Sequence, residues 1–120
     1  MHELSLAENI LDIVKQYVPE KERRHLIKVR LRVGTNAGVV LDSLRFSFEA
    51  ILHGTEMETA ALEIESIPYT VDCNACGRTS MPESGSVGCP LCGGIDTRIT
   101  AGTELQVVDL ELAEPSGGKP

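Results

Sequence analysis

The stretches Cys73-Asn-Ala-Cys-Gly77 and Cys89-Pro-Leu-Cys-Gly93 contain all four cysteines of this 120-residue chain, in the spacing C-x2-C-x12-C-x2-C. Two residues between thiols allow one turn to direct both sulfurs at a single tetrahedral ion, and the glycine after each pair permits the tight backbone of that turn. In a reducing compartment, thiols at this spacing bind metal rather than form disulfides. The pattern therefore predicts a structural zinc site of four thiolates, Cys73, Cys76, Cys89 and Cys92.

Two other uses of this cysteine pattern stay open at this point. The segment CPLCG (89–93) also resembles a rubredoxin knuckle, in which four cysteines hold a redox-active iron, although rubredoxins have a wider gap between knuckles and an aromatic-rich core. A zinc ribbon can instead act as an adaptor or bind nucleic acid. Residues 68–102 carry more acids than bases, and four thiolates on zinc add negative charge, so contact with phosphate is disfavoured.

The segments on both sides of the cysteines predict an α+β core. A capping box at Ser5 and Glu8 predicts the start of a helix that ends at Pro19. Its apolar face consists of Leu6, Ile10, Ile13 and Tyr17, widened by Ala7, Leu11, Val14 and Val18. Apolar periodicity predicts a half-buried strand over 27–33, a second helix over 41–51 and a second strand over 62–65. A last strand is expected at about 104–112, where a shift in apolar phase indicates a bulge.

We therefore expect two helices packed on a small sheet of about three strands, with an inserted zinc-ribbon-like module. Changes in composition place the α+β domain at residues 1–67 plus 103–115, the zinc-binding domain at 68–102 and a flexible tail at 116–120. Only 3% of the residues are aromatic, so the core is small and a bound metal would help to stabilise it.

Charge and hydropathy narrow the classes of function. The formal net charge of −7 argues against nucleic acid as a partner. The chain has no run of 18 apolar residues and begins with an amphipathic segment, so we expect neither a membrane span nor a signal peptide, and a cytoplasmic location. It has no glycine-rich phosphate loop and no evident nucleophile–base pair, so no catalytic activity is expected. The basic strand face of Lys28, Arg30 and Arg32 is expected to be solvated and to guard against edge pairing.

The first three residues, Met1-His2-Glu3, offer a different set of metal ligands. The α-amine, the His2 amide nitrogen and the His2 imidazole can close five- and six-membered chelate rings around one ion. The amide nitrogen of Glu3 can complete a plane of four nitrogens. Square-planar nitrogen ligation suits Ni(II) or Cu(II). Most histidines at a second position bind no metal, so these residues alone leave the role of His2 open.

Four further segments occur in one order around the cysteines. They are MHELSLAENILDIV (1–14), LDSLRFSFEAILHGT (41–55), ALEIESIP (61–68) and AGTELQVVDLELAE (101–114). In this combination the chain resembles the HypA/HybF family of hydrogenase-maturation nickel metallochaperones over nearly its whole length. The loop VGTNAGVVLDSL (33–44) departs from the Gly-x-Leu-Ser-Gly-Val pattern that is commoner in that family. This departure leaves open whether residues 34–40 contact metal or a partner.

The resemblance implies a carrier of Ni(II) rather than an enzyme. His2 would be the essential side-chain ligand, with the Met1 amine and the His2 and Glu3 amides around the ion, and the Glu3 carboxylate can affect nickel geometry or partner contact. The resemblance also implies that the four cysteines hold a structural Zn²⁺, while nickel is cargo. The implied partners are a nickel-handling GTPase and the large subunit of [NiFe]-hydrogenase, and in some bacteria urease and its accessory proteins. Whether the chain is a monomer or a homodimer stays open.

Overall fold

The computed structural model describes residues 3–83, 86 and 88–114. The chain folds into two compact units. The first contains residues 1–31, 39–64 and 107–120, and the second contains 32–38 and 65–106. Within the described residues, neither α-helix has the length and apolar character needed to cross a membrane.

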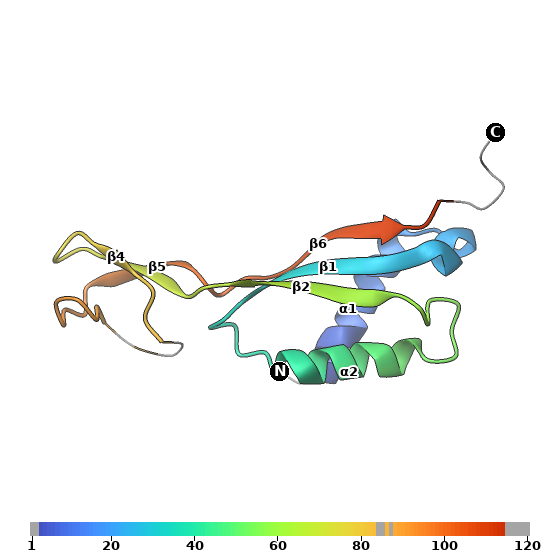
Figure 1. Cartoon of the computed structure of the whole chain (residues 1–120), viewed down its shortest axis with the longest axis horizontal. Coiled ribbons are helices and arrows are strands. Elements are labelled where there is room, and N and C mark those ends of the chain that lie inside the picture. Colours follow the sequence, from blue (N-terminus) through green and yellow to red (C-terminus); the bar gives the residue numbers. More distant parts are fainter. Residues whose placement is uncertain (1–2, 84–85, 87, 115–120) are drawn as a thin grey trace. The chain divides into compact units, whose positions relative to one another are not determined.

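The first unit contains two helices that lie on the same face of its strands (Figure 1). Helix α1 (Glu3–Tyr17) and helix α2 (Leu41–Leu52) pack against each other. The sheet has the order β2 (Ala61–Ile67), β1 (Leu26–Gly34), β6 (Leu105–Leu112), and residues 32–34, 65–67 and 105–106 of these strands belong to the second unit. Buried side chains recur at three- and four-residue spacing on both helices, as expected for amphipathic helices. They are Leu6, Ala7, Ile10 and Val14 on α1, and Leu44, Phe48 and Leu52 on α2. The predicted pair of helices on a three-stranded sheet is confirmed.

Two details of α1 differ from the prediction. The helix already includes Glu3, so Ser5 lies within its first turn, and the prediction that Ser5 caps the helix is wrong. An acid in the first turn favours a helix start at this earlier point, because its negative charge interacts favourably with the positive N-terminal end of the helix dipole. Tyr17, predicted on the apolar face, is 74% exposed, because Val14 and Val18 occupy the buried positions at the end of the helix.

The end of α1 is closed by a side chain from the following 3₁₀ helix, η1 (Glu20–His25). Arg23 Nε donates a hydrogen bond to the carbonyl oxygen of Val18 at 3.1 Å, and Arg23 Nη2 donates to that of Lys15 at 3.3 Å. These bonds satisfy carbonyl groups that have no partner within the helix. Arg23 therefore acts as the C-terminal cap that the sequence did not reveal.

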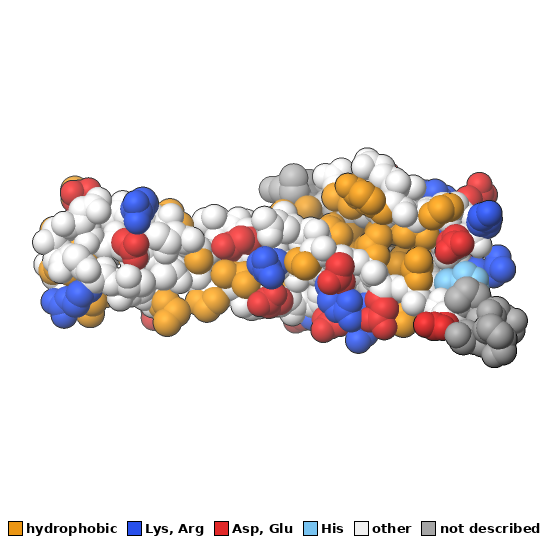
Figure 2. All heavy atoms as spheres, turned by 90° about the horizontal axis from the view of Figure 1, so that it is seen from above, with side chains coloured by type: hydrophobic (Ala, Val, Ile, Leu, Met, Phe, Trp, Pro, Cys, Tyr) orange, Lys and Arg blue, Asp and Glu red, His pale blue; other side chains and the backbone are white. Residues whose placement is uncertain are grey.

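The basic face of β1 is solvated, as expected, but it joins strands rather than guarding an edge. Lys28 Nζ lies 3.3 Å from Glu63 Oε1 on β2, and Arg30 Nη1 lies 2.8 Å from Asp109 Oδ1 on β6. Arg30 also binds Glu111, and hydrogen bonds to Asp109 and Glu111 raise the pKa of Arg30 far above its usual value. Figure 2 shows charged side chains of both signs gathered on this unit. Because β1 is the central strand, the prediction that its charges protect a free edge is wrong.

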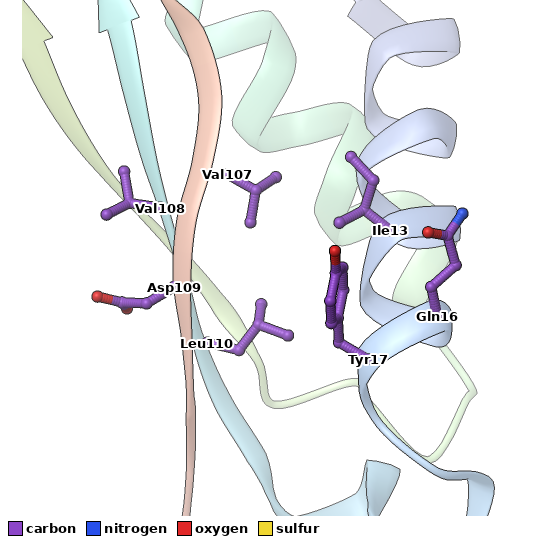
Figure 3. Close-up of a pocket in the computed structure, with 7 residues that line it drawn as sticks. All are labelled: Ile13, Gln16, Tyr17, Val107, Val108, Asp109 and Leu110. Atoms are coloured by element: carbon purple, nitrogen blue, oxygen red, sulfur yellow. The ribbon is translucent and has the colours of Figure 1, made fainter.

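Strand β6 has the irregularity that the shift in its apolar phase indicates. In Figure 3 the side chains of Val107 and Leu110 point toward α1, whereas those of Val108 and Asp109 both point away from it. Two consecutive side chains on the same side are the signature of a β-bulge. The bulge lets the strand present apolar residues to the helices both before and after Asp109, which faces solvent with Arg30.

The second unit contains a second sheet, which the sequence did not predict. Its antiparallel strands have the order β4 (Thr79–Ser80), β3 (Thr70–Cys73), β5 (Thr97–Ala101). These strands are short and rich in threonine, so they show little apolar alternation. The pairing of Cys73 with Thr97 places the first cysteine at the end of β3.

Two glycines allow three segments of the second unit to cross at very short distance. A Cβ atom on Gly34 would lie 2.0 Å from the carbonyl carbon of Gly102, and one on Gly102 would lie 2.2 Å from Tyr69 Cα. The amide of Gly34 donates to the carbonyl of Glu104 at 2.8 Å, and that of Asn36 donates to the carbonyl of Gly102 at 2.8 Å. Gly102 also has φ of +106°, which strongly favours glycine. Any side chain at either position would push these segments apart.

Replacing Gly102 by alanine should therefore lower the free energy of unfolding by about 2–5 kcal/mol, through backbone strain and overpacking. Gly38→Ala is the matched control, because Gly38 also has positive φ (+77°) but has no atom within 4 Å of the added Cβ. That variant should lose only about 1 kcal/mol, the cost of positive φ alone. Urea unfolding of both variants measures the difference, and equal losses would contradict the steric role of the crossing.

Candidate metal centre

The four cysteine side chains converge in the second unit, with all four sulfurs within 4.8 Å of one another. The Sγ atoms of Cys73 and Cys92 are 3.6 Å apart, and those of Cys76 and Cys89 are 3.8 Å apart. Tetrahedral zinc with Zn–S bonds of about 2.3 Å requires sulfurs about 3.8 Å apart, whereas a disulfide requires about 2.05 Å. All four cysteines are free thiols. Their arrangement therefore fits one tetrahedral metal ion.

The two cysteine pairs form nearly identical turns. The amide of Gly77 donates to the carbonyl of Cys73 at 2.9 Å, and the amide of Gly93 donates to that of Cys89 at 2.8 Å. These glycines have φ of +74° and +78°. The residue after each pair therefore needs the left-handed backbone for which glycine was expected.

Backbone amides are directed at the sulfurs. The amide of Cys76 donates to Cys73 Sγ at 3.4 Å, that of Leu91 to Cys89 Sγ at 3.3 Å and that of Gly94 to Cys92 Sγ at 3.4 Å. Hydrogen bonds to sulfur stabilise the thiolate, which is the form that binds metal. The chain thus offers preformed partners for negative charge on this cluster.

The surroundings of the four thiols shift the pKa of Cys76 and that of Cys92 in opposite directions. A backbone hydrogen bond with Arg78 is the largest influence on Cys76 and lowers its pKa to about 7. The backbone hydrogen bond with Gly94 also lowers the pKa of Cys92, but the neighbouring thiols, led by Cys73, and burial together raise it to about 11. A cation entering the cluster must displace the remaining protons, so its affinity falls as the pH falls.

The cysteines also supply much of what is buried in the second unit. Cys73 and Cys89 are each 3% exposed, and the other buried apolar side chains of this unit are Val33, Tyr69 and Val71 among the described residues. An interior this small buries little apolar surface, so metal–sulfur bonds would supply cohesion that side-chain packing does not. Four thiolates also complete a tetrahedron and leave no position for a substrate. The site therefore has the features of a structural metal site.

Cys89→Ser should remove most of the bound metal and broaden the amide NMR signals of β3 and β5, because the unit loses both a ligand and a buried side chain. Leu91→Ser changes a half-exposed residue within the same turn and should retain the metal. Elemental analysis of the purified proteins gives the metal content. Full metal occupancy in the Cys89 variant would show that this thiol is not a ligand.

The predicted nickel ligands Met1 and His2 lie outside the described residues. Glu3 is described, and its Oε2 accepts a hydrogen bond from the amide of Val40 at 3.0 Å. Val40 directly precedes helix α2 and has no side chain that can cap it. The Glu3 carboxylate therefore joins the first turn of α1 to the residue before α2. Part of the loop in which the sequence departs from the family pattern thus contacts the third residue of the chain.

This contact has no signal in the sequence, because the donor is a main-chain amide and Val40 is apolar. Two other loop residues make backbone hydrogen bonds within the second unit: the amide of Thr35 donates to the carbonyl of Ile67, and that of Ala37 donates to the carbonyl of Gly34. Glu3 and the four cysteines belong to different units, so the predicted ligands fall into two separate sets.

Glu3→Ala should accelerate hydrogen exchange at the Val40 amide about fivefold, as expected when a hydrogen bond of about 1 kcal/mol is lost. Glu3→Gln retains an oxygen acceptor and should preserve most of the protection. Asp42→Ala, which removes a nearby acid in the first turn of α2, serves as the control. If the Val40 amide exchanged at the same rate in Glu3→Ala and the parent, the contact would be absent in solution.

Comparison with known proteins points to one family. The family model described as "Hydrogenase/urease nickel incorporation, metallochaperone, hypA" matches residues 1–112. A hydrogenase maturation factor HypA of Chloroflexus aggregans is 42% identical over 112 residues, which cover 92% of this chain and 98% of the relative. One of Syntrophus aciditrophicus is 38% identical over 113 residues, which cover 93% of this chain and 99% of the relative.

Solved structures show the same fold at lower sequence identity. The solution structure of the nickel metallochaperone HypA of Helicobacter pylori aligns with a TM-score of 0.62 and 19% identity, covering 96% of this chain and all of the other. A second solution structure of a HypA protein aligns with a TM-score of 0.64 and 19% identity, covering 93% and 96% of the two chains.

Proposed function

Because this chain belongs to the HypA family, we propose that it is a nickel metallochaperone that binds Ni(II) through Met1, His2 and Glu3. The observation that carries the proposal is the extent of the family match. It runs from residue 1 to residue 112 and so includes both the Met-His-Glu start and all four cysteines. The proposed function, nickel delivery, is the one that the family's description names: nickel incorporation into hydrogenase and urease.

The chemistry of these residues suits nickel as a cargo. The α-amine, two amide nitrogens and the His2 imidazole form a square-planar nitrogen set, which Ni(II) accepts and zinc does not favour. The hydrogen bond from the Val40 amide to the Glu3 carboxylate supports a positioning role for that side chain, because it holds one carboxylate oxygen at the residue before α2. We propose that Glu3 contributes its amide nitrogen to nickel and uses its carboxylate to position the start of α1.

Zinc is the proposed resident ion of the four-cysteine site. The spacing of the sulfurs fits tetrahedral Zn–S bonds, and Cys73, Cys76, Cys89 and Cys92 provide the complete ligand set. When bound, zinc would supply charge neutralisation and cross-linking of the two turns. We propose that residues 68–102 form the zinc-binding domain and that 1–67 plus 103–115 form the nickel-binding domain.

The proposed role is delivery rather than catalysis. We propose that the chain acts in the cytoplasm, receives nickel with a nickel-handling GTPase, and delivers it to the large subunit of [NiFe]-hydrogenase or to the urease accessory proteins. A nitrogen site at a chain terminus can be approached by the ligands of an acceptor, so nickel can leave by ligand exchange. A closed four-thiolate site lacks that access.

His2→Ala in a protein with a native, untagged start should lose at least about 100-fold in nickel affinity, because one side-chain ligand and its chelate ring disappear. His53→Ala removes a largely exposed histidine beyond α2, whose Nδ1 lies 3.0 Å from Glu58 Oε2, and this variant should bind nickel as the parent does. Isothermal titration with nickel, together with zinc analysis, separates the two sites. Equal affinity of the His2 variant and the parent would rule out the terminal site.

Nickel should also dissociate as the pH falls, because protons compete for the amine and imidazole nitrogens. Acetylating the α-amine should weaken binding at neutral pH, since it removes one donor. The planar nitrogen set has a characteristic visible absorption, which reports occupancy during an acid titration. Nickel binding that is unchanged by acetylation would exclude the amine as a ligand.

A further inference from the structure

An apolar groove lies in the first unit between α1 and β6. It has a volume of about 590 Å³. In Figure 3, Ile13 and Tyr17 of α1 face Val107 and Leu110 of β6 across it. Tyr17 is 74% exposed, although it is large and partly apolar. The groove therefore leaves contact surface on both walls available to another molecule.

One side of the groove is an unpaired strand edge. Strand β6 is terminal in the order β2-β1-β6, and no described strand pairs with its outer edge. The opposite terminal strand, β2, has a side-chain partner for its backbone: Arg45 Nη1 on α2 donates a hydrogen bond to the carbonyl of Leu62 at 2.7 Å. The bulge at Val108 and Asp109 interrupts the β6 edge and disfavours long strand pairing. The occupant that fits is a short extended segment anchored by side chains.

The charges around the groove favour a basic occupant. Asp109 is the charged residue among those that line it; its side chain lies on the face of β6 turned away from α1, where it and Glu111 bind Arg30. Arg30 offsets only part of this charge, because it binds both carboxylates. On α1 the lining residues Ile13, Gln16 and Tyr17 are uncharged, so the acidic charge beside the groove lies on the β6 wall.

We propose that this groove docks a short extended segment of a partner protein, with apolar side chains on one face and lysine or arginine on the other. The apolar side chains would insert between Tyr17 and Leu110, and the basic ones would lie beside Asp109 and Glu111. A recognition mode of this kind combines side-chain pockets with hydrogen bonds to a strand edge. The proposal concerns partner binding and does not depend on nickel.

A second copy of this chain fits the groove less well. Pairing β6 with β6 would bring Asp109 and Glu111 of two chains together, and each chain has a formal charge of −7. Like charges placed side by side oppose association. The bulge adds a geometric obstacle to continuous pairing of identical strands. Charge thus favours a basic segment from a different protein.

Two nine-residue peptides test the proposal on the full, metal-containing chain. One alternates valine and lysine, and the other replaces each lysine with glutamate. The lysine peptide should bind at least about tenfold more tightly, with affinity that weakens as salt rises. It should shift the amide NMR signals of Ile13, Tyr17, Val107 and Leu110. Equal binding of the two peptides, or shifts confined to other residues, would overturn the proposal.

Matched variants assign the binding to the groove. Tyr17→Ala should weaken the lysine peptide about tenfold, whereas Phe46→Ala, which removes an equally exposed aromatic on α2, should not. Asp109→Asn should reduce the preference for lysine over glutamate, and Asp42→Asn should leave it unchanged. Concentration-dependent dimers abolished by Tyr17→Ala would show that a second copy is the occupant and would refute a different partner. Because these measurements use no nickel, a negative result leaves the nickel proposal intact.

Discussion

Four sulfur atoms within 4.8 Å of one another are the constraint on which the second unit depends. Its strands are only two to five residues long, and its interior holds few apolar side chains besides Tyr69 and Val71. Without a cation, several thiols and thiolates in contact would repel or share protons, as the opposed pKa values of Cys76 and Cys92 indicate. One divalent ion would convert this repulsion into cohesion. Structural zinc contributes on the order of 10 kcal/mol in peptides of comparable size, which is as large as the stability of a whole domain.

The close approach of the backbone at Gly34, Gly102 and Tyr69 also stabilises the second unit, because it brings three segments into hydrogen-bonding distance. Gly34, Gly102 and Tyr69 bring three distant segments to distances that no side chain would permit. Backbone hydrogen bonds at 2.8 Å then fix these segments. The first unit is stabilised by a different principle. Its helices bury a continuous apolar interior, and ion pairs from β1 to both neighbouring strands are exposed and contribute less than about 1 kcal/mol each.

The features that the sequence predicts well are those encoded by local spacing. The C-x2-C pairs with their following glycines, the apolar periodicity of both helices and the phase shift in β6 each reflect a short-range rule, and the structure bears them out. The features it does not predict depend on distant parts of the chain. Ser5 and Glu8 form a valid capping pattern, but the helix begins earlier. Tyr17 obeys the helical period, yet the groove leaves it exposed. The hydrogen bond from the Val40 amide to the Glu3 carboxylate has a main-chain donor, so the residue type at position 40 does not predict it.

The two proposed metal sites differ in how easily incoming ligands can reach the ion, which separates a structural ion from a transferable one. Thiolates that surround an ion completely, with two of them buried, give incoming ligands little access. A planar site at a chain end stays open above and below its plane. Such a site binds Cu(II) more strongly than Ni(II), as the general affinity order for divalent ions requires. Affinity alone therefore does not select nickel, and selection must come from the proteins that load the site and receive from it. Surfaces that recognise those proteins are thus as necessary to the proposed function as the ligands themselves. If both proposals hold, the groove beside α1, the helix that begins at Glu3, would place partner recognition and the nickel ligand Glu3 in the same unit.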